Sequence, residues 1–372
     1  MNRKTRVAVL YGGKSGEHEV SLKSAASVLR HLDRERFEPV PISIDKQGRW
    51  QCHDLRSIDA TNGESLPIPS DSPAVRLEAL GSRTAVLPAD NAAPAIEPVD
   101  VVFPVMHGPL CEDGAVQGLL ELSGAAYVGS GVLASSVGMH KDIAKRLAAL
   151  AGLPVAPYLA LSRRGWRRDP EGSAQAARAQ LTLPVFVKPC NMGSSVGVHK
   201  VKSWEELDAA LTDAFLYDTK VLVEQGIDAR EIEVAVLDGD PPAASVASEL
   251  NAGPQHEFYS YEAKYIDQDG ASVDLPAKLD ATQMERVRKL AVDAFLALEC
   301  SGLARVDFFL DRKSGAFYFN EINTLPGFTA ISMYPKMMEA SGLPYSALIT
   351  RLIELAQEHH AERAGLKTDY AS

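Results

Sequence analysis

The sequence predicts a mixed fold, an α/β part followed by an α+β part, divided among two or three domains. Length is the first observation, because 372 residues exceed what one compact core usually holds. The second is a strand, a glycine-containing turn and a helix in succession, at 7–22 and again at 101–122, which is the pattern of α/β units. The third is a pair of short apolar strands, 306–310 and 316–319, joined by a turn, which predicts an antiparallel hairpin.

Composition excludes several classes of protein. Hydrophobic residues make up 46% of the chain, and no apolar run is long enough to cross a membrane. The start, MNRKTRVAVL, lacks the cleavage site of a signal peptide, so we expect a cytoplasmic protein without a membrane partner. The net charge of −11 argues against nucleic acid as a partner, because phosphate backbones require a basic surface. Four scattered cysteines without Cys-x-x-Cys spacing indicate free thiols rather than zinc sites, iron–sulfur ligation or disulfides.

The first α/β unit, VAVLYGGKSGEHEVSL, ends its strand in a glycine turn that marks a ligand crevice. The run Gly13 to Ser15 imitates a phosphate-binding Walker loop, but that motif needs a glycine where this chain has Ala8. We therefore exclude it. Glu17 lies in the same turn and can bind a substrate cation, or it can simply complement the dipole of a helix expected to begin near Ser21.

The second unit, VVFPVMHGPLCEDGAVQGLLEL, places His107, Glu112 and Asp113 in the turn after its strand. A single histidine in a loop is usually structural, but the carboxyl ends of strands are where α/β sheets bind ligands. The preceding proline-rich residues 64–98 are expected to form a surface insertion with no chemistry. After a strand at 125–128, the run Gly129 to Gly131 imitates a dinucleotide fingerprint but lacks the acid expected about twenty residues later.

A new unit is expected to start near Met139, with a helix that Lys141 opens and of which His140 is a surface residue. Further on, VFVKPCNMGSSVGV carries Lys188 on a strand into a loop of small residues, Gly193 to Ser195. Such a loop lets backbone N–H groups close around phosphate oxygens while the lysine supplies a charge; the alternative is a flexible surface loop. A strand at 220–224 then ends in polar residues beside Gly226 and Ile227, an edge that suits the amino group of an adenine.

The C-terminal part contains a long polar segment and then the hairpin. Residues 253–270 include FYSYEAKYI and are expected to form a lid. Asp307 lies within the first hairpin strand, and Glu321 and Asn323 alternate after the second, so all three oxygen-bearing side chains can face one Mg²⁺ site beside Arg305. The alternative is an ordinary solvated hairpin edge. Helix caps are predicted at Ser203 to Glu206 and at Thr282 with Glu285.

Together these segments resemble the D-alanine–D-alanine ligases of the ATP-grasp superfamily. The resemblance covers the chain from first strand to last helix except the proline-rich insertion, and it rests on GGKSGEHEVS, HGPLCEDG, GSSVG, YEAKY, ARVD and NEINTLPG in that order. It implies an N-terminal α/β domain at 1–138 with the insertion 64–98, a central ATP-grasp subdomain at 139–224, and a C-terminal subdomain at 225–372 with the lid 253–270. ATP would lie between two antiparallel sheets.

The resemblance also implies a function. Two D-alanines would be joined through an acyl phosphate, with release of ADP and phosphate, for peptidoglycan precursor synthesis in bacteria. The cofactors would be ATP and two Mg²⁺ ions, with Mn²⁺ able to substitute and K⁺ a candidate activator, and the protein would be a homodimer. Alternatives left open are a D-alanine–D-lactate or D-alanine–D-serine ligase, another ATP-grasp ligase, and a nucleotide-binding regulator without catalysis.

Site residues follow from the resemblance by position. The ATP contacts would be Lys141, Lys188, Ser194, Ser195, Glu224, Ile227, Glu231 and Lys264. The metal ligands would be Asp307, Glu321 and Asn323. The substrate-binding and catalytic residues would be Glu17, His107, Ser194, Tyr265, Arg305, Gly327 and Ser332. One departure stands out: the family has a glycine where this chain has Cys111, so the turn after His107 would have to differ if a left-handed backbone is needed there.

Overall fold

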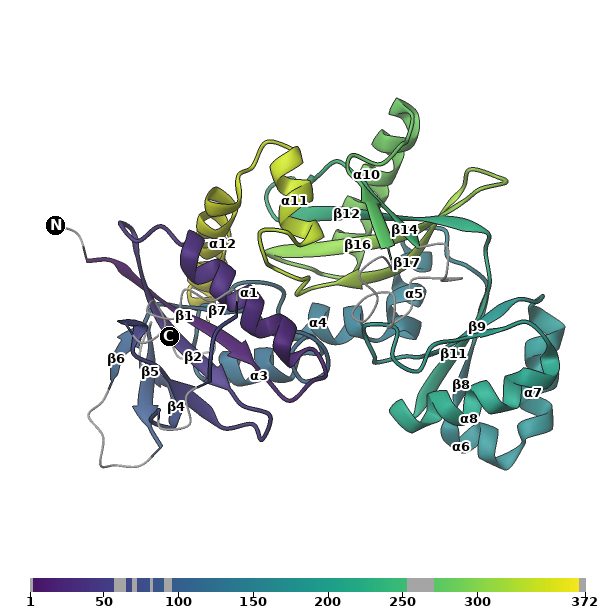
Figure 1. Ribbon diagram of the computed structural model, residues 1–372, viewed down its shortest axis with the longest axis horizontal. Coiled ribbons are helices and arrows are strands. Elements are labelled where there is room, and N and C mark those ends of the chain that lie inside the picture. Colours follow the sequence, from purple (N-terminus) through teal and green to yellow (C-terminus); the bar gives the residue numbers. More distant parts are fainter. Residues whose placement is uncertain are drawn as a thin grey trace.

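The computed structural model describes residues 3–56, 65–68, 72–80, 83–89, 96–252 and 271–367. The expected lid at 253–270, with Lys264 and Tyr265, lies outside the described residues, as does part of the insertion at 64–98. Figure 1 shows three bodies: an N-terminal sheet in purple and blue, a green and yellow C-terminal sheet, and a teal central sheet. Within the described ranges, no helix is both long and apolar enough to cross a bilayer.

The N-terminal sheet has the order β3-β2-β1-β7, and β1 pairs in parallel with both β2 and β7. Strand β1 is buried along seven of its eight residues, as expected for a parallel strand covered on both faces. Because the carboxyl ends of β1 and β7 meet at one edge, the turns after them are neighbours. The elements are β1 (Thr5–Gly12), α1 (His18–His31), β2 (Phe37–Ile44), β3 (Trp50–Cys52), β7 (Val101–Pro104) and α3 (Ala115–Leu122).

The proline-rich insertion contains more order than the sequence predicted. Three antiparallel strands form a small sheet of their own, β4 (Val75–Leu80), β5 (Arg83–Pro88) and β6 (Ile96–Val99). The strand expected at 125–128 is reduced to an isolated bridge between Val102 and Tyr127.

The helix expected from near Met139 is α5 (Lys141–Leu150), which Lys141 opens as predicted, and a separate helix, α4 (Val132–Met139), precedes it. His140 separates them and caps α5, since its Nδ1 accepts a hydrogen bond from the Ile143 N–H at 3.3 Å. The prediction of a surface helix residue at His140 was therefore wrong. Helix α5 packs on the C-terminal sheet, where its small residues Ala144 and Ala148 are fully buried.

The central sheet is antiparallel, in the order β10-β9-β11-β8. Its apolar core lies between the sheet and the helices beside it and includes Val187, Leu211 and Val223. The elements are β8 (Tyr158–Ser162), α6 (Arg163–Arg168), α7 (Pro170–Gln180), β9 (Val185–Pro189), β10 (His199–Val201), the short 3₁₀ helix η1 (Trp204–Glu206), α8 (Leu207–Tyr217) and β11 (Lys220–Gln225).

The C-terminal sheet has the order β15-β14-β12-β16-β17, with β13 beside β12. Along β16, Val306, Phe308 and Leu310 are buried against the core under α10, while the residues between them face the other side. The elements are β12 (Ala229–Leu237), β13 (Ala243–Ala244), β14 (Ser248–Ala252), β15 (Ala271–Asp274), α10 (Ala281–Ala297), β16 (Leu303–Asp311) and β17 (Phe317–Asn323).

The predicted hairpin is confirmed, and β17 is longer than predicted. It continues through Asn323, because Glu321 and Asn323 pair with Asp307 and Arg305 of β16. The predicted helix caps were wrong: α10 has a capping box from Asp280 and Gln283, and the Ser203 side chain caps no backbone N–H.

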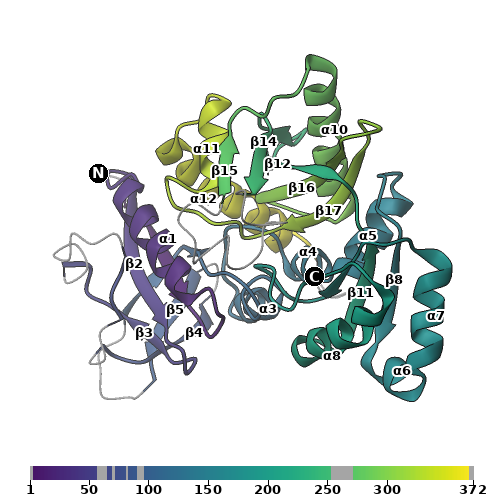
Figure 2. The same ribbon diagram turned by 45° about the vertical axis from the view of Figure 1, so that its right-hand side comes forward.

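Two last helices, α11 (Met333–Ala340) and α12 (Tyr345–Ala364), return the chain to its beginning. Figure 2 shows them between the C-terminal sheet and the N-terminal sheet. Leu348, Ile349 and Leu352 of α12 share one buried core with Val7 and Val9 of β1. The N-terminal and C-terminal parts are therefore packed together through a common core.

Candidate active site

Acidic side chains form a row across three neighbouring strands. Glu233 of β12 pairs with Asp307 of β16, which pairs with Glu321 of β17. Directly paired residues point to the same face of a sheet, and the Asn323 Nδ2 donates a hydrogen bond to Asp307 Oδ2 at 3.0 Å. The structure thus brings together the three side chains that the sequence proposed as metal ligands.

Arg305 lies within this row. Its Nε and Nη2 each donate to one carboxylate oxygen of Asp307, both at 2.7 Å, and its Nε is 3.4 Å from Glu233 Oε1. Burial raises the pKa of Asp307 to about 7, although Arg305 opposes the shift.

Sequence reasoning missed Glu233 as a member of this row. The signal was available, because Glu233 follows Glu231 at an alternate position on a strand.

A second cluster is basic and lies where α5 meets β9 and β11. Lys188 Nζ is 2.6 Å from Glu224 Oε1, and Lys145 Nζ is 2.7 Å from Glu224 Oε2. Burial opposes ionisation of Glu224, but the charges of Lys145 and Lys188 outweigh it and lower its pKa to about 2. Lys141 Nζ donates to the Met192 carbonyl at 2.7 Å and is 3.1 Å from Glu321 Oε2, so it connects the two clusters.

Sequence reasoning also missed Lys145, although it follows Lys141 by four residues and so lies on the same face of the helix. Ile227 lies in the short connection between β11 and β12, and Glu231 on β12 pairs with Phe309 of β16. Lys188 Nζ lies 5.4 Å from the centre of the Phe309 ring. The proposed adenine and ribose contacts therefore fall at the junction of the two antiparallel sheets.

The loop after β9 has an unusual backbone. Ser194 and Ser195 have φ angles of 52° and 59°, a left-handed backbone conformation that residues other than glycine rarely adopt. Ser194 Oγ donates a hydrogen bond of 2.6 Å to Glu17 Oε1. This bond holds the loop against the turn after β1. The turn after β7 is also close to Glu17, because a β-carbon at Gly108 would come within 2.8 Å of Glu17 Oε2.

His107 connects the N-terminal part to the C-terminal loop. Its Nδ1 lies 3.0 Å from the Leu325 carbonyl, its Nε2 is 3.2 Å from Ser24 Oγ, and Glu112 is 3.8 Å away. Burial opposes protonation of His107, but Glu112 outweighs it and raises the pKa. In this turn Gly108, Leu110 and Gly114 have positive φ angles, with Leu110 at 70°, and Cys111 does not. A side chain at Cys111 is therefore tolerated without backbone strain.

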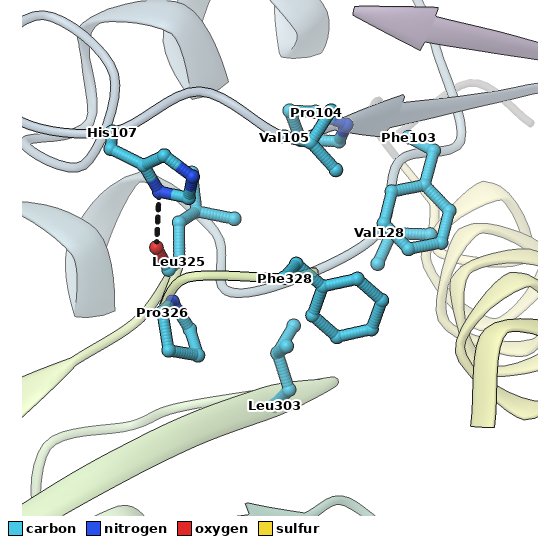
Figure 3. A pocket seen from close by; sticks show the side chains of 9 residues that line it. All are labelled: Phe103, Pro104, Val105, His107, Val128, Leu303, Leu325, Pro326 and Phe328. Atoms are coloured by element: carbon cyan, nitrogen blue, oxygen red, sulfur yellow. Dashed lines mark hydrogen bonds between the residues drawn. The ribbon is translucent and has the colours of Figure 1, made fainter. Parts of the chain in front are cut away.

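The last predicted residues lie in the loop before α11. Ser332 Oγ accepts a hydrogen bond from the Thr329 N–H at 3.0 Å. A β-carbon at Gly327 would come 3.2 Å from this oxygen, so Gly327 and Ser332 are neighbours. Figure 3 shows a small cavity beside this loop, lined in part by His107 and Leu325, which are hydrogen-bonded to each other. The cavity volume of about 10 Å³ leaves room for roughly one water. The cavity is lined by Phe103, Pro104, Val105, His107, Val128, Leu303, Leu325, Pro326 and Phe328.

The donors present fit a nucleotide and a divalent cation. The described residues contain no group of three or more His, Cys, Asp or Glu side chains arranged for a metal, so the donor set would be two carboxylates and one amide oxygen. Such oxygen ligands, completed by substrate phosphates, suit Mg²⁺. Lys188 and Lys145 lie 2.6 Å and 2.7 Å from the two carboxylate oxygens of Glu224, so this buried group carries one more positive than negative charge, which suits an anionic phosphate.

Comparison with solved structures defines the class. The VanG D-Ala:D-Ser ligase from Enterococcus faecalis superposes with a TM-score of 0.81 at 35% identity, covering 95% of this chain and 100% of the other. The D-alanine-D-alanine ligase from Coxiella burnetii gives 0.80 at 36% identity, covering 97% and 96%. The paired antiparallel sheets with an N-terminal α/β domain are thus the ATP-grasp fold that the sequence predicted.

Sequence comparison then defines the family. The profile described as "D-ala D-ala ligase N-terminus" matches residues 6–130, and that described as "D-ala D-ala ligase C-terminus" matches 147–354. The chain is 66% identical to "D-alanine--D-alanine ligase A" of Bradyrhizobium diazoefficiens and 45% identical to "D-alanine--D-alanine ligase" of Legionella pneumophila, in both cases over the whole of each chain. The chain belongs to the D-alanine–D-alanine ligase family.

Proposed function

We infer that this chain is an ATP-dependent ligase that joins two molecules of D-alanine into D-alanyl-D-alanine for peptidoglycan precursor synthesis. The observation that carries this conclusion is the 66% identity, over both complete chains, to a protein named D-alanine–D-alanine ligase A. The enzyme uses ATP and a divalent metal, as its family does. The residue roles below, the two Mg²⁺ ions, substitution by Mn²⁺ and activation by K⁺ belong to the proposal.

The first step activates a carboxylate, which by itself is a poor electrophile. The D-alanine carboxylate attacks the terminal phosphoryl group of ATP, forming an acyl phosphate and ADP. Lys141 and Lys188, with the N–H groups of the loop at Ser194 and Ser195, would neutralise and orient the phosphates. Asp307, Glu321 and Asn323 would hold the divalent ions, which supply further charge neutralisation at the phosphoryl group when bound. Lys264 of the expected lid is proposed to reach the same group.

The second step forms the C–N bond. The free amine of the second D-alanine attacks the acyl carbon, a proton leaves the nitrogen, and phosphate departs. Arg305 and the Gly327 N–H would stabilise the negative oxygen that develops. Asp307 and Glu233 support this role, because they hold the Arg305 guanidinium in one orientation.

The amino-acid ends would be held separately. Glu17 would bind the ammonium of the first D-alanine, with His107 beside it, and Ser332 would bind the carboxylate of the second. Their placement supports this, because Glu17 is bonded to the phosphate loop and Ser332 adjoins Gly327. Tyr265 is proposed to fix the lid over the second substrate.

The alternatives with a different second substrate are not favoured. The VanG D-Ala:D-Ser ligase has a similar structure, but its identity of 35% is far below the 66% of the D-alanine–D-alanine ligase A. An inactive nucleotide-binding protein is opposed by the clustering of Asp307, Glu321 and Asn323 beside Arg305.

A homodimer in the cytoplasm completes the proposal. Five large apolar side chains of α3, the start of α4 and the turn before α3 are exposed, and we call them the α3–α4 patch. Ser136 of α4 bonds the Asp113 carbonyl, so the two helices are adjacent. Large apolar residues exposed on adjacent helices are typical of association surfaces. The patch consists of Leu110, Leu119, Leu122, Val132 and Leu133.

One assay tests the function. ADP and phosphate formation should depend on D-alanine and Mg²⁺, and mass spectrometry should identify D-alanyl-D-alanine as the product. L-alanine should give neither. Mixtures of D-alanine with D-serine or D-lactate should yield mainly the D-alanine dipeptide across pH. Phosphate release without dipeptide, or mixed products in excess, would overturn the proposal.

A further inference from the structure

Lys145 is a buried lysine to which neither the sequence nor the proposed mechanism gives a role. Only 1% of its side chain is exposed, so Lys145 is covered by the protein at the proposed ATP site. Its two observed partners are Glu224 Oε2 at 2.7 Å and the Phe319 carbonyl at 3.2 Å. An isolated buried ammonium is costly, which means that a lysine here needs an explanation.

Neutralising Glu224 does not by itself explain Lys145. Lys188 Nζ, at 2.6 Å from Glu224 Oε1, already provides one positive charge for that carboxylate. With Lys145 added, the cluster of two lysines and one glutamate carries a surplus charge of +1. A buried surplus charge costs several kcal/mol unless an opposite charge joins it.

The row of acidic side chains on the C-terminal sheet has a surplus of negative charge instead. Arg305 contributes one positive charge, against two negative charges from Asp307 and Glu233. Lys141 and Glu321 form a pair of their own at 3.1 Å. The two halves are thus suited to different ligands: the carboxylate half to a cation and the lysine half to an anion.

We propose that Lys145 is a positioning residue for nucleotide phosphates. It neutralises Glu224 through the carboxylate oxygen that Lys188 does not contact, so that the positive charge of Lys188 stays available to a phosphate oxygen. Without Lys145, Glu224 and Lys188 form a neutral pair and Lys188 is committed to the carboxylate. This inference rests on the proposed ATP site and adds to it a residue that acts without touching the ligand. Burial lowers the pKa of Lys145 although Glu224 opposes the shift, and the pKa of Glu224 is lowered to about 2, in keeping with a cluster in need of an anion.

The decisive experiment changes the cluster charge stepwise. The wild type carries +1, Lys145→Met carries 0, and the double variant Lys145→Met/Glu224→Gln returns to +1. Calorimetry should show Lys145→Met binding ATP about tenfold more weakly, as expected for one lost charge near a phosphate. Adenosine, which has no phosphate, should bind within about twofold of the wild type, and the KM for D-alanine should change little.

The double variant should regain part of the ATP affinity, because Lys188 is no longer neutralised. It also removes both partners of a buried ion pair, so it is tested even if Lys145→Met alone is unstable. Lys145→Arg, which keeps the positive charge, should retain ATP binding. Lys289 is an exposed lysine on α10, and Lys289→Met should bind ATP as the wild type does.

The outcomes separate two failures. A wild type that does not bind ATP contradicts the proposed function. If the wild type binds ATP, the role of Lys145 is overturned by a Lys145→Met variant that binds ATP as well as the wild type, or that loses adenosine and ATP equally. It is also overturned by a double variant whose ATP affinity, relative to its adenosine affinity, is no higher than that of Lys145→Met.

Discussion

Ser194 and Glu17 are hydrogen-bonded at 2.6 Å although 177 residues separate them in the chain. The bond joins the loop proposed to hold phosphates to the turn proposed to hold the first amino acid. Ser194 makes this bond from a left-handed backbone conformation, with φ 52°. Strain of this kind persists where the surrounding structure enforces it, often at functional sites.

Removing this bond should therefore impair catalysis more than folding. A hydrogen bond to a charged group contributes roughly 1.5–3 kcal/mol, so Ser194→Ala should lower kcat/KM for D-alanine by about one to two orders of magnitude. Steady-state kinetics at saturating ATP measure the effect. Ser195→Ala is the comparison, since it changes the adjacent left-handed residue and keeps the bond to Glu17. An equal loss of D-alanine efficiency in both variants would argue against a specific role for the Ser194–Glu17 bond.

Glu321 should control the response to the divalent metal. It lies opposite Asp307 on the adjacent strand and is 3.1 Å from Lys141. Glu321→Gln should reduce turnover by at least about tenfold, or roughly 1.4 kcal/mol in the barrier, and should move the activity curve to higher Mg²⁺ concentration. Glu339→Gln on the exposed side of α11 is the matched control. If Glu321→Gln follows the wild-type Mg²⁺ curve, Glu321 is not a ligand.

Much of the fold and site could be predicted because the signals were local. Glu321 and Asn323 occupy alternate positions on one strand, so their side chains share a face, whereas Asp307 comes opposite Glu321 only through a register shift between Asp307 and Phe308. Glu17 and His107 follow strands of one parallel sheet, whose carboxyl ends meet. The choice of site residues could therefore be predicted from local patterns, while their exact register could not.

The remaining features depend on contacts between distant segments. Lys145 lies on an amphipathic helix, where a lysine usually faces solvent, and it is buried by β11 and by β17, whose Phe319 comes 174 residues later. Two cap patterns, Asp280 with Gln283 and Thr282 with Glu285, begin two residues apart at the start of α10, and sequence favours neither. The structure selects Asp280, and only the packing of the helix decides between such registers.

The α3–α4 patch should mediate the proposed dimer. Leu133 is 63% exposed at the start of α4, so an aspartate there adds a charge to the patch without disturbing the core. Light scattering after size exclusion should give twice the chain mass of 40.1 kDa for the wild type and a single chain for Leu133→Asp. Leu150→Asp, at a position 85% exposed at the end of α5, should remain dimeric. A dimeric Leu133→Asp variant would place the interface elsewhere.

Stability should depend on pH through an ion pair that attaches the last helix. His359 Nε2 of α12 lies 3.2 Å from Asp238 Oδ2, just after β12. The hydrogen bond to Asp238 raises the pKa of His359 above its ordinary 6.5. Burial opposes ionisation of Asp238, but His359 and two backbone N–H groups outweigh it and lower its pKa below 3.8.

The signs define the range. A raised histidine pKa means that the stabilisation is complete below pH 6.5 and is lost as the pH rises through the folded-state value. A lowered aspartate pKa means that the stabilisation is also lost in acid, below 3.8.

His359 is partly exposed, so the pair should contribute roughly 0.2–1 kcal/mol. His359→Gln should therefore lower the melting temperature near pH 6 by about 2 °C or less, and the difference should vanish near pH 9. His360→Gln, the neighbouring residue, should not show this pH dependence. A His359→Gln difference that stays constant from pH 6 to 9 would mean that the histidine charge does not stabilise this contact.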